Sequence, residues 1–348
     1  MKRLSRDLWK LGKPRLSGLV AFSAGLGFLS AGSPVSLAAL GAAVSGTALC
    51  SFSANTFNQI IERDSDALMR RTMMRPLPTR RVSIPQAMVY GVMSGVVGTG
   101  LLYLGTNPLT ALLGLGNIVA YAGIYTPMKK VTPWNTAVGA VVGALPPVMG
   151  WAAATGSIVA PEALFLFLFQ FLWQIPHFLA LAYKYRKDYT IGGYKMLAVD
   201  SVDPSGKLCA DISLYSALAM IPLPFYTSSI DMTFWMFAVD ATVVNSWLLY
   251  ESWKFREETN QKNANRLFKC SLVSLSLFLA LFVYHKKKAY QRKDDESVFD
   301  LNLGGLHQVA SSLCPHEFMA SEENVQMCPK VTGNIVKEQG IATVLTNL

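Results

Sequence analysis

Nine apolar stretches dominate this chain of 348 residues, and each is long enough, or nearly so, to cross a lipid bilayer. A transmembrane helix needs about 20 apolar residues to cover the hydrocarbon core. The stretches cover residues 16–32, 35–61, 86–105, 108–126, 134–154, 161–183, 210–227, 232–250 and 267–285. They predict an all-α, polytopic membrane protein with nine transmembrane helices.

Composition and charge placement favour the same class. Charged residues make up 15% of the chain, against about 25% in soluble domains. Twenty-three Lys and Arg residues fall in segments 1–15, 62–85, 127–132, 184–209 and 251–266. The connections near residues 33, 106, 157 and 229 have none. The positive-inside rule predicts that the N-terminus and the basic segments share one side of the membrane. These basic segments explain the net charge of +9. The chain has no basic stripe with interleaved aromatics, so the sequence does not indicate nucleic-acid binding.

The ends of the chain differ from the middle. Residues 1–15 are basic and amphipathic, and we expect an interfacial segment there in preference to a mitochondrial targeting remnant. Residues 16–285 form the expected transmembrane domain. Residues 286–348 are polar and aperiodic, and we expect a disordered tail. The five cysteines are scattered without a CxxC pair, so neither a zinc ribbon nor a disulfide framework is indicated.

The strongest site pattern begins at Asn58. Asn58, Glu62 and Asp66 are spaced i, i+4 and i+8, which places one amide and two carboxylates on a single helix face. Arg71 and Arg75 follow closely. Oxygen ligands suit Mg²⁺, and arginines clamp phosphate oxygens. Charges also occur normally at a membrane boundary, but three oxygen ligands in register favour a metal and phosphate site.

A second polar cluster lies at the end of the sixth apolar stretch. It contains Trp173, Gln174, His177, Lys184 and Asp188. A lone histidine is often a packed core residue, but polar groups at membrane depth are costly and favour a functional role. Asp188 suits either a salt bridge with its basic neighbours or a second metal-binding carboxylate.

Tyr125 and Lys129 form a third cluster, spaced i and i+4 at the end of the fourth stretch. Lysines at helix ends are commonly interfacial anchors. The spacing also lets both side chains reach a diphosphate.

Several motifs together resemble one family. NxxxExxxD at Asn58–Asp66 and MxRTxxRPLP at Met69–Pro78 resemble the UbiA superfamily of intramembrane prenyltransferases, and within it the subfamily that farnesylates haem. The other matching motifs are KPRL (Lys13–Leu16), YTPMKK (Tyr125–Lys130), TPWNTAVGAVVGALPPVMGW (Thr132–Trp151), WQIPHFLALA (Trp173–Ala182), YRKDY (Tyr185–Tyr189) and GGYKML (Gly192–Leu197). The resemblance covers about residues 10–285.

The resemblance implies a nine-helix bundle around an apolar cavity. Farnesyl diphosphate would bind there with Mg²⁺ and ionise, and the allylic cation would be attacked by a vinyl group of haem B. Water would complete the hydroxyethylfarnesyl group of haem O, the precursor of haem A in cytochrome oxidase.

The implied roles follow residue by residue. The metal ligands would be Asn58, Glu62, Asp66 and Asp188. The diphosphate contacts would be Arg71, Arg75, Lys129 and Tyr125. The haem contacts would be His177, which suits haem iron, and Lys184, which suits a propionate, with Trp173 and Gln174 as further substrate-binding residues. Many relatives carry a DxxxD motif whose last aspartate corresponds to Asp188. Four positions earlier, where those relatives have the first aspartate, this chain has Lys184, so the number of Mg²⁺ ions stays open.

Alternatives of other classes remain. A haem or ion transporter would suit the spans, but no inverted repeat is evident. A non-catalytic scaffold would not need the register of Asn58 and Asp66. A relative that prenylates a phenol such as 4-hydroxybenzoate is the enzyme alternative.

The resemblance also implies a location and partners. They are the mitochondrial inner membrane, with the basic loops on the matrix side, and haem A synthase as a protein partner, besides haem B, farnesyl diphosphate and lipid. A bacterial plasma membrane is the alternative location, and the sequence gives no oligomeric state.

Overall fold

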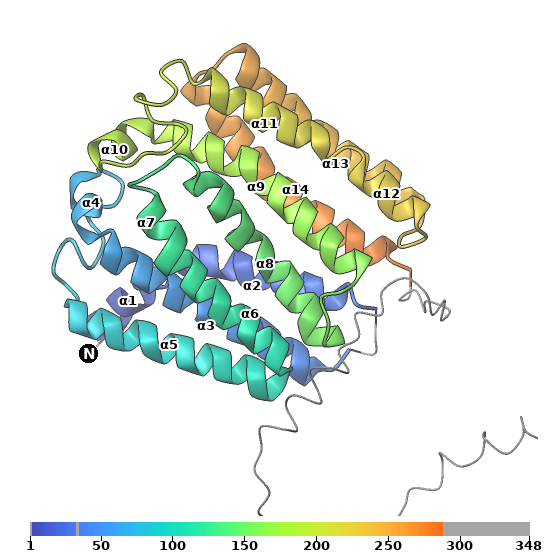
Figure 1. The fold of residues 1–348 in the computed structure, drawn as a ribbon, viewed down its shortest axis with the longest axis horizontal. Coiled ribbons are helices and arrows are strands. Elements are labelled where there is room, and N and C mark those ends of the chain that lie inside the picture. Colours follow the sequence, from blue (N-terminus) through green and yellow to red (C-terminus); the bar gives the residue numbers. More distant parts are fainter. Residues whose placement is uncertain (1, 33–34, 288–348) are drawn as a thin grey trace, which may run out of the picture. The chain divides into compact units, whose positions relative to one another are not determined.

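A computed structural model describes residues 2–32 and 35–287, and within them the chain is helical (Figure 1). The first half contains α1 (Lys2–Leu11), α2 (Pro14–Leu29), α3 (Leu37–Ile61), α4 (Arg63–Leu68), α5 (Ile84–Gly105), α6 (Pro108–Val119), the π-helix η1 (Ala120–Tyr125) and α7 (Thr126–Met128). The second half contains α8 (Asn135–Thr155), α9 (Pro161–Lys184), α10 (Arg186–Ile191), α11 (Lys207–Ala219), α12 (Leu223–Ser229), α13 (Met236–Glu257) and α14 (Gln261–His285). The all-α prediction is confirmed.

Every predicted apolar stretch is helical, but nine membrane spans are not confirmed. Within the described ranges, seven helices are long and apolar enough to cross a membrane. Helix α2 is apolar but has only 16 residues. Helix α13 has 22 residues but falls outside that set. It carries Asp240, Asn245 and Glu251 along its length. The predicted tail lies outside the described residues except for Lys286 and Lys287.

Small residues let the long helices approach closely. A Cβ at Gly98 of α5 would lie 2.8 Å from the backbone nitrogen of Cys50 in α3. Between α2 and α8, a Cβ at Gly27 would overlap the carbonyl oxygen of Pro147, and one at Gly150 that of Ala24. Such close contact between helices is typical of membrane bundles, where packing replaces the hydrophobic effect as the driving force.

The second half of the bundle has an aromatic core. Phe169 of α9 stacks on Phe278 of α14, with ring centroids 3.7 Å apart. Phe237 of α13 meets Phe278 edge to face at 5.4 Å. These buried rings fix α9 against α14, and both helices carry residues that line or support the cavity described below.

The basic segments meet at one end of the bundle. Arg81 forms an ion pair with Asp7 at 2.9 Å, and the backbone nitrogen of Lys195 donates to the carbonyl oxygen of Lys129 at 2.7 Å. The side chain of Gln261 donates to the carbonyl oxygen of Lys184. The alternation of basic and uncharged connections therefore corresponds to alternating helix directions. Which end faces which compartment stays a prediction.

Candidate active site

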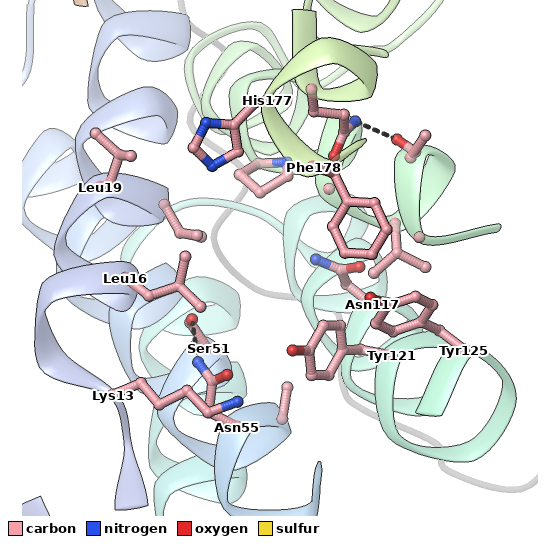
Figure 2. Close-up of a pocket in the computed structure, with 18 of the residues that line it drawn as sticks. Lys13, Leu16, Leu19, Ser51, Asn55, Asn117, Tyr121, Tyr125, His177 and Phe178 are labelled. Atoms are coloured by element: carbon pink, nitrogen blue, oxygen red, sulfur yellow. Dashed lines mark hydrogen bonds between the residues drawn. The ribbon is translucent and has the colours of Figure 1, made fainter. Parts of the chain in front are cut away.

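A cavity of about 360 Å³ lies among α2, α3, the fourth apolar segment (α6, η1 and α7), α8 and α9. This volume is within the usual range of ligand pockets. Figure 2 shows Lys13, Asn55, Tyr121 and Tyr125 on its polar side and His177 on another wall. Most of the rest of the lining is apolar. The cavity thus combines a charged end with an apolar body.

The predicted oxygen cluster stays in register across a break in the helix. Helix α3 ends at Ile61, and Glu62 separates it from α4. The backbone nitrogen of Glu62 still donates to the carbonyl oxygen of Asn58 at 2.9 Å, and that of Asp66 donates to Glu62 at 2.8 Å. Because these i to i+4 bonds continue, the three side chains remain about one turn apart.

Each member of this cluster faces a cation. Lys13 Nζ donates to Asn58 Oδ1 at 2.7 Å. Lys129 Nζ lies 2.8 Å from Glu62 Oε1, and Arg75 Nη1 lies 2.6 Å from Asp66 Oδ2. The two carboxylates and these three cations line the cavity, while Asn58 lies behind Lys13, outside the lining. Three cationic side chains and two carboxylates are therefore gathered at one end of the cavity.

Burial and charge determine the pKa values of these groups. Burial alone would raise the pKa of Glu62, but Lys129 and Lys13 outweigh it and hold the pKa below its usual range. Burial would lower the pKa of Lys129, but Glu62 holds it well above its usual value. For Asp66, burial outweighs Arg75, so its pKa is raised. Burial, with Arg75 nearby, lowers the pKa of Lys13 to about 7.

The oxygen donors fit a divalent cation. Asp66 Oδ1 is buried and has no hydrogen-bond partner among the described residues. An unpartnered carboxylate oxygen in a buried place is costly, and a hard cation such as Mg²⁺ would satisfy it. The described residues contain no group of three His, Cys, Asp or Glu side chains already gathered around a point. The predicted ligand set is therefore only partly assembled.

Asp188 does not line the cavity. Its Oδ2 accepts a hydrogen bond from the backbone nitrogen of Arg71 at 3.3 Å. The Arg71 guanidinium donates to Tyr189 Oη at 3.1 Å and lies 4.9 Å from the ring centroid of Tyr185. Asp188 thus holds the Arg71 segment at the mouth of the cavity, and its role as a metal ligand stays a prediction.

Tyr125 and Lys129 lie next to each other, and their joint contact with a diphosphate stays a prediction. Lys129 Nζ lies 4.5 Å from the ring centroid of Tyr125, and both residues line the cavity. Gly139 of α8 leaves room for this ring, because a Cβ there would lie 2.6 Å from Tyr125 Cε2. The π-helix before Tyr125 was not predicted from the sequence; such turns are frequent at functional sites.

The residues of the second cluster take different positions. Trp173, Gln174 and His177 line the cavity. The Gln174 side chain donates to the carbonyl oxygen of Ala140. Lys184 does not line the cavity, and its Nζ donates to Asn265 Oδ1 at 2.7 Å.

Aromatic rings hold His177 in place. Its imidazole stacks between Trp173 and Phe268, with centroid distances of 4.9 and 4.8 Å. Its Nδ1 lies 2.8 Å from Ser271 Oγ of α14. Figure 2 shows the ring turned toward the cavity.

The structure adds residues that sequence reasoning did not single out as a site. Lys13 adopts a left-handed conformation with φ of 48°, which is uncommon for residues other than glycine and clusters at functional sites. Tyr121 lines the cavity beside Tyr125. Tyr194 also lines it, with a buried hydroxyl that has no partner among the described residues. The signal for Lys13 was its place in the KPRL motif.

The fold and the site define a helical membrane protein with a cavity that combines a cation-rich end and an apolar body. The chain belongs to the UbiA prenyltransferase family, whose model matches residues 19–275. It is a multi-pass membrane protein.

Similar proteins have related names. The protein called "Protoheme IX farnesyltransferase, mitochondrial" of Arabidopsis thaliana is 39% identical over 289 residues, covering 81% of this chain and 65% of that protein. The human protein of that name is 40% identical, with 80% and 62% covered. "Protoheme IX farnesyltransferase" of Opitutus terrae is 38% identical, with 80% and 93% covered. The chain therefore spans less than two thirds of the first two relatives.

Solved structures share the fold at low sequence identity. A digeranylgeranylglyceryl phosphate synthase matches with a TM-score of 0.64 and 15% identity, over 82% of this chain and 99% of that one. A UbiA homolog from Archaeoglobus fulgidus bound to GPP and Mg²⁺ matches with a TM-score of 0.54 and 16% identity, over 80% and 98%. At this identity the match establishes the fold alone.

Proposed function

We propose that this chain transfers the farnesyl group of farnesyl diphosphate to a vinyl group of haem B and so forms haem O, on the route to haem A. One observation carries the proposal. The cavity has a cation-rich end where Lys129 and Arg75 pair with Glu62 and Asp66, and a wall that presents the imidazole of His177. Relatives of about 40% identity bear the name of this activity.

The diphosphate would bind at the cationic end. Arg75, Lys129 and Lys13 line it, and Arg71 stands at its mouth with an exposed side chain. Diphosphate leaves only when its developing charge is stabilised, so fixed cations aimed at it lower the barrier. Tyr125 would orient Lys129, since the ammonium lies over its ring.

Mg²⁺ would be held by oxygens of Asn58, Glu62 and Asp66, with Asp188 as the proposed ligand from the second motif. When bound, the ion supplies further charge neutralisation for the leaving diphosphate. The homolog from Archaeoglobus fulgidus was solved with GPP and Mg²⁺, which supports a divalent metal in the family. In this chain Lys129 and Arg75 already pair with the two carboxylates, and Lys13 binds Asn58 Oδ1. Binding of metal and diphosphate would therefore rearrange all three contacts.

The chemistry balances with water as the only reactant besides the two substrates. The C–O bond of farnesyl diphosphate breaks, and diphosphate leaves with the electron pair. The vinyl group of haem B forms a C–C bond to the allylic cation, and the resulting cation is captured by water, which loses one proton. The apolar walls around Ile118, Met149 and Phe178 would keep water from the first cation until the C–C bond has formed.

On the haem side, His177, Trp173 and Gln174 would contact the macrocycle. Lys184 is the proposed partner of a propionate. Its Nζ lies 5.8 Å from the ring centroid of Phe268, next to the aromatic stack of His177. In the present geometry Lys184 binds Asn265, so this contact requires its side chain to turn.

Domain organisation and location form part of the proposal. Residues 16–285 would be the catalytic domain, and α1 would lie at the membrane surface as the interfacial segment 1–15. The names of the plant and human relatives include the word mitochondrial. We place the protein in the mitochondrial inner membrane, with the basic end facing the matrix. Haem A synthase is the proposed recipient of the product.

Release of diphosphate by purified protein in nanodiscs tests the proposal. Farnesyl diphosphate and Mg²⁺ would be supplied with haem B, with 4-hydroxybenzoate or with no acceptor. We expect release that depends on haem B and is lost in Asp66→Ala. Release that depends on 4-hydroxybenzoate would replace haem with a phenolic acceptor. No release with either acceptor, although haem binds, would favour a transporter or scaffold.

A further inference from the structure

Ser271 of α14 makes contacts that determine the protonation of His177. Its Oγ lies 2.8 Å from His177 Nδ1 and 2.8 Å from the carbonyl oxygen of Phe268. Its own carbonyl oxygen accepts the indole N–H of Trp173 at 2.8 Å. One serine thus supports both the histidine and the ring stacked on it.

Counting protons assigns the tautomer. A hydroxyl has one proton to donate, and a carbonyl oxygen only accepts, so the Ser271 proton lies toward Phe268. The Oγ must then accept from His177, which puts the imidazole proton on Nδ1. If Nδ1 lacked the proton, one of the two 2.8 Å contacts would bring two acceptors together. The arrangement that satisfies all groups leaves the lone pair on Nε2.

Nε2 is directed toward the cavity. In the described part of the chain, the hydrogen bonds of this ring are confined to Nδ1. The faces of the ring are covered by Trp173 and Phe268, which leaves its edge to point outward. Figure 2 shows one ring nitrogen of His177 pointing into the space between Leu16 and Phe178.

We propose that Ser271 is a positioning residue that fixes the Nδ1–H tautomer of His177, so that Nε2 is an axial ligand to the iron of the bound porphyrin. The inference rests on the proposed function for its choice of haem as substrate. A histidine that binds a metal usually donates its other ring N–H to an acceptor, which fixes the ring and raises its basicity. The stack prevents the ring from rotating, so the porphyrin would be held at a defined place relative to the cationic end.

The test is the iron ligation of the purified full-length protein in nanodiscs. Ferrous and ferric haem B would be titrated, with absorption, resonance Raman and electron paramagnetic resonance as readouts. We expect the iron–histidine stretch in the ferrous wild type. Its absence in wild type overturns the proposal without any variant.

Variants then separate ligand from positioning residue. In His177→Ala the iron–histidine band should vanish and added imidazole should restore it. In Ser271→Ala the affinity for haem B should fall about 10- to 100-fold and the band should shift, whereas Ser271→Thr should preserve both. The matched control is Ser274→Ala, which removes a buried hydroxyl one turn away that donates to the Ser271 carbonyl oxygen. If Ser271→Ala and Ser274→Ala behave alike, the positioning role is wrong.

Metal-free protoporphyrin IX guards against misfolding. In His177→Ala and Ser271→Ala its affinity should fall far less than the affinity for haem B, because it has no iron to ligate. If a variant also loses its affinity for protoporphyrin, its cavity is no longer intact. The proposal is then tested by the iron–histidine band of the wild type and by its preservation in Ser271→Thr. A protein that farnesylates haem without the iron–histidine band keeps the proposed function and overturns the inference. A protein that shows the iron–histidine band but transfers no farnesyl group keeps the inference about Ser271 and His177 and overturns the proposed function.

Discussion

Glu62 Oε1 lies 2.8 Å from Lys129 Nζ, which joins the end of α3 to the end of the fourth apolar segment across 67 residues of sequence. Both side chains are about nine-tenths buried. In that setting a lone charge is strongly unfavourable, but a pair is tolerated. The ion pair therefore fixes two helix ends around the cavity and keeps both charges ready for a ligand.

Loss of one partner should destabilise the protein. In Lys129→Met, Glu62 stays buried without its cation, and we expect a loss of roughly 3–5 kcal/mol in the free energy of unfolding. The measurement is denaturant unfolding in micelles. Lys130→Met is the matched control, because Lys130 is exposed on the neighbouring position. The double variant Glu62→Gln/Lys129→Met should recover most of the stability without activity. Equal stability of Lys129→Met and Lys130→Met would contradict the role of the ion pair.

Substitution of Asp66 should lower kcat far more than substitution of the nearby Asp64. In Asp66→Asn the carboxylate that pairs with Arg75 is lost, and kcat should fall by about 10²- to 10³-fold, the usual effect of removing one electrostatic contact to a transition state. Steady-state release of diphosphate measures it. Asp64→Asn serves as control, since Asp64 is exposed and pairs with Arg63. Similar losses in both variants would argue against the site.

A methyl group at Gly143 should disturb the acceptor side of the cavity. A Cβ at that position would overlap Gln174 Oε1, so Gly143→Ala displaces the amide that binds the Ala140 carbonyl oxygen. We expect a several-fold rise in KM for haem B with the KM for farnesyl diphosphate unchanged. Gly116→Ala is the control, because a Cβ there meets nothing within 4 Å. A rise in both KM values would show a general loss of packing.

The membrane orientation can be read from cysteine labelling. In a variant without native cysteines, Lys130→Cys and Ser157→Cys place thiols at exposed positions on opposite ends of α8. A membrane-impermeant maleimide applied to intact mitoplasts should label only the thiol at 157, because the basic end is expected to face the matrix. Labelling at 130 alone would show the opposite orientation. Labelling of both thiols would show that the two ends of α8 do not lie on opposite sides of the membrane.

The helices were predictable because apolar runs of this length have few alternatives in a membrane. The register of Asn58, Glu62 and Asp66 was predictable as well, since i to i+4 bonds continue through the break at Glu62. The break itself was not predictable, because nothing in the local sequence marks it. The same holds for η1, where the backbone adopts a π-turn within an ordinary apolar run.

Contacts between distant segments were harder to predict. Spacing alone suggested that Tyr125 and Lys129 act together, but not that Lys129 pairs with Glu62. For Asp188 the sequence left both a salt bridge and a metal-binding role open, and it did not predict that its Oδ2 accepts from the backbone nitrogen of Arg71. Lys184 has the charge for a propionate, yet its position is set by α14 through Asn265. Such pairings depend on how the helices pack against each other, and the residue types within one segment do not determine that packing.

We infer that one cavity joins the farnesyl carbon to haem and lets water enter only afterwards. The direct measurement is mass spectrometry of the haem product after turnover with deuterium-labelled farnesyl diphosphate in ¹⁸O-water. We expect a single haem product that carries the whole labelled farnesyl group and one ¹⁸O atom, and we expect no such product in Asp66→Asn. Unchanged haem together with ¹⁸O-labelled farnesol would contradict it, because the cavity would then hydrolyse the diphosphate without joining the two substrates.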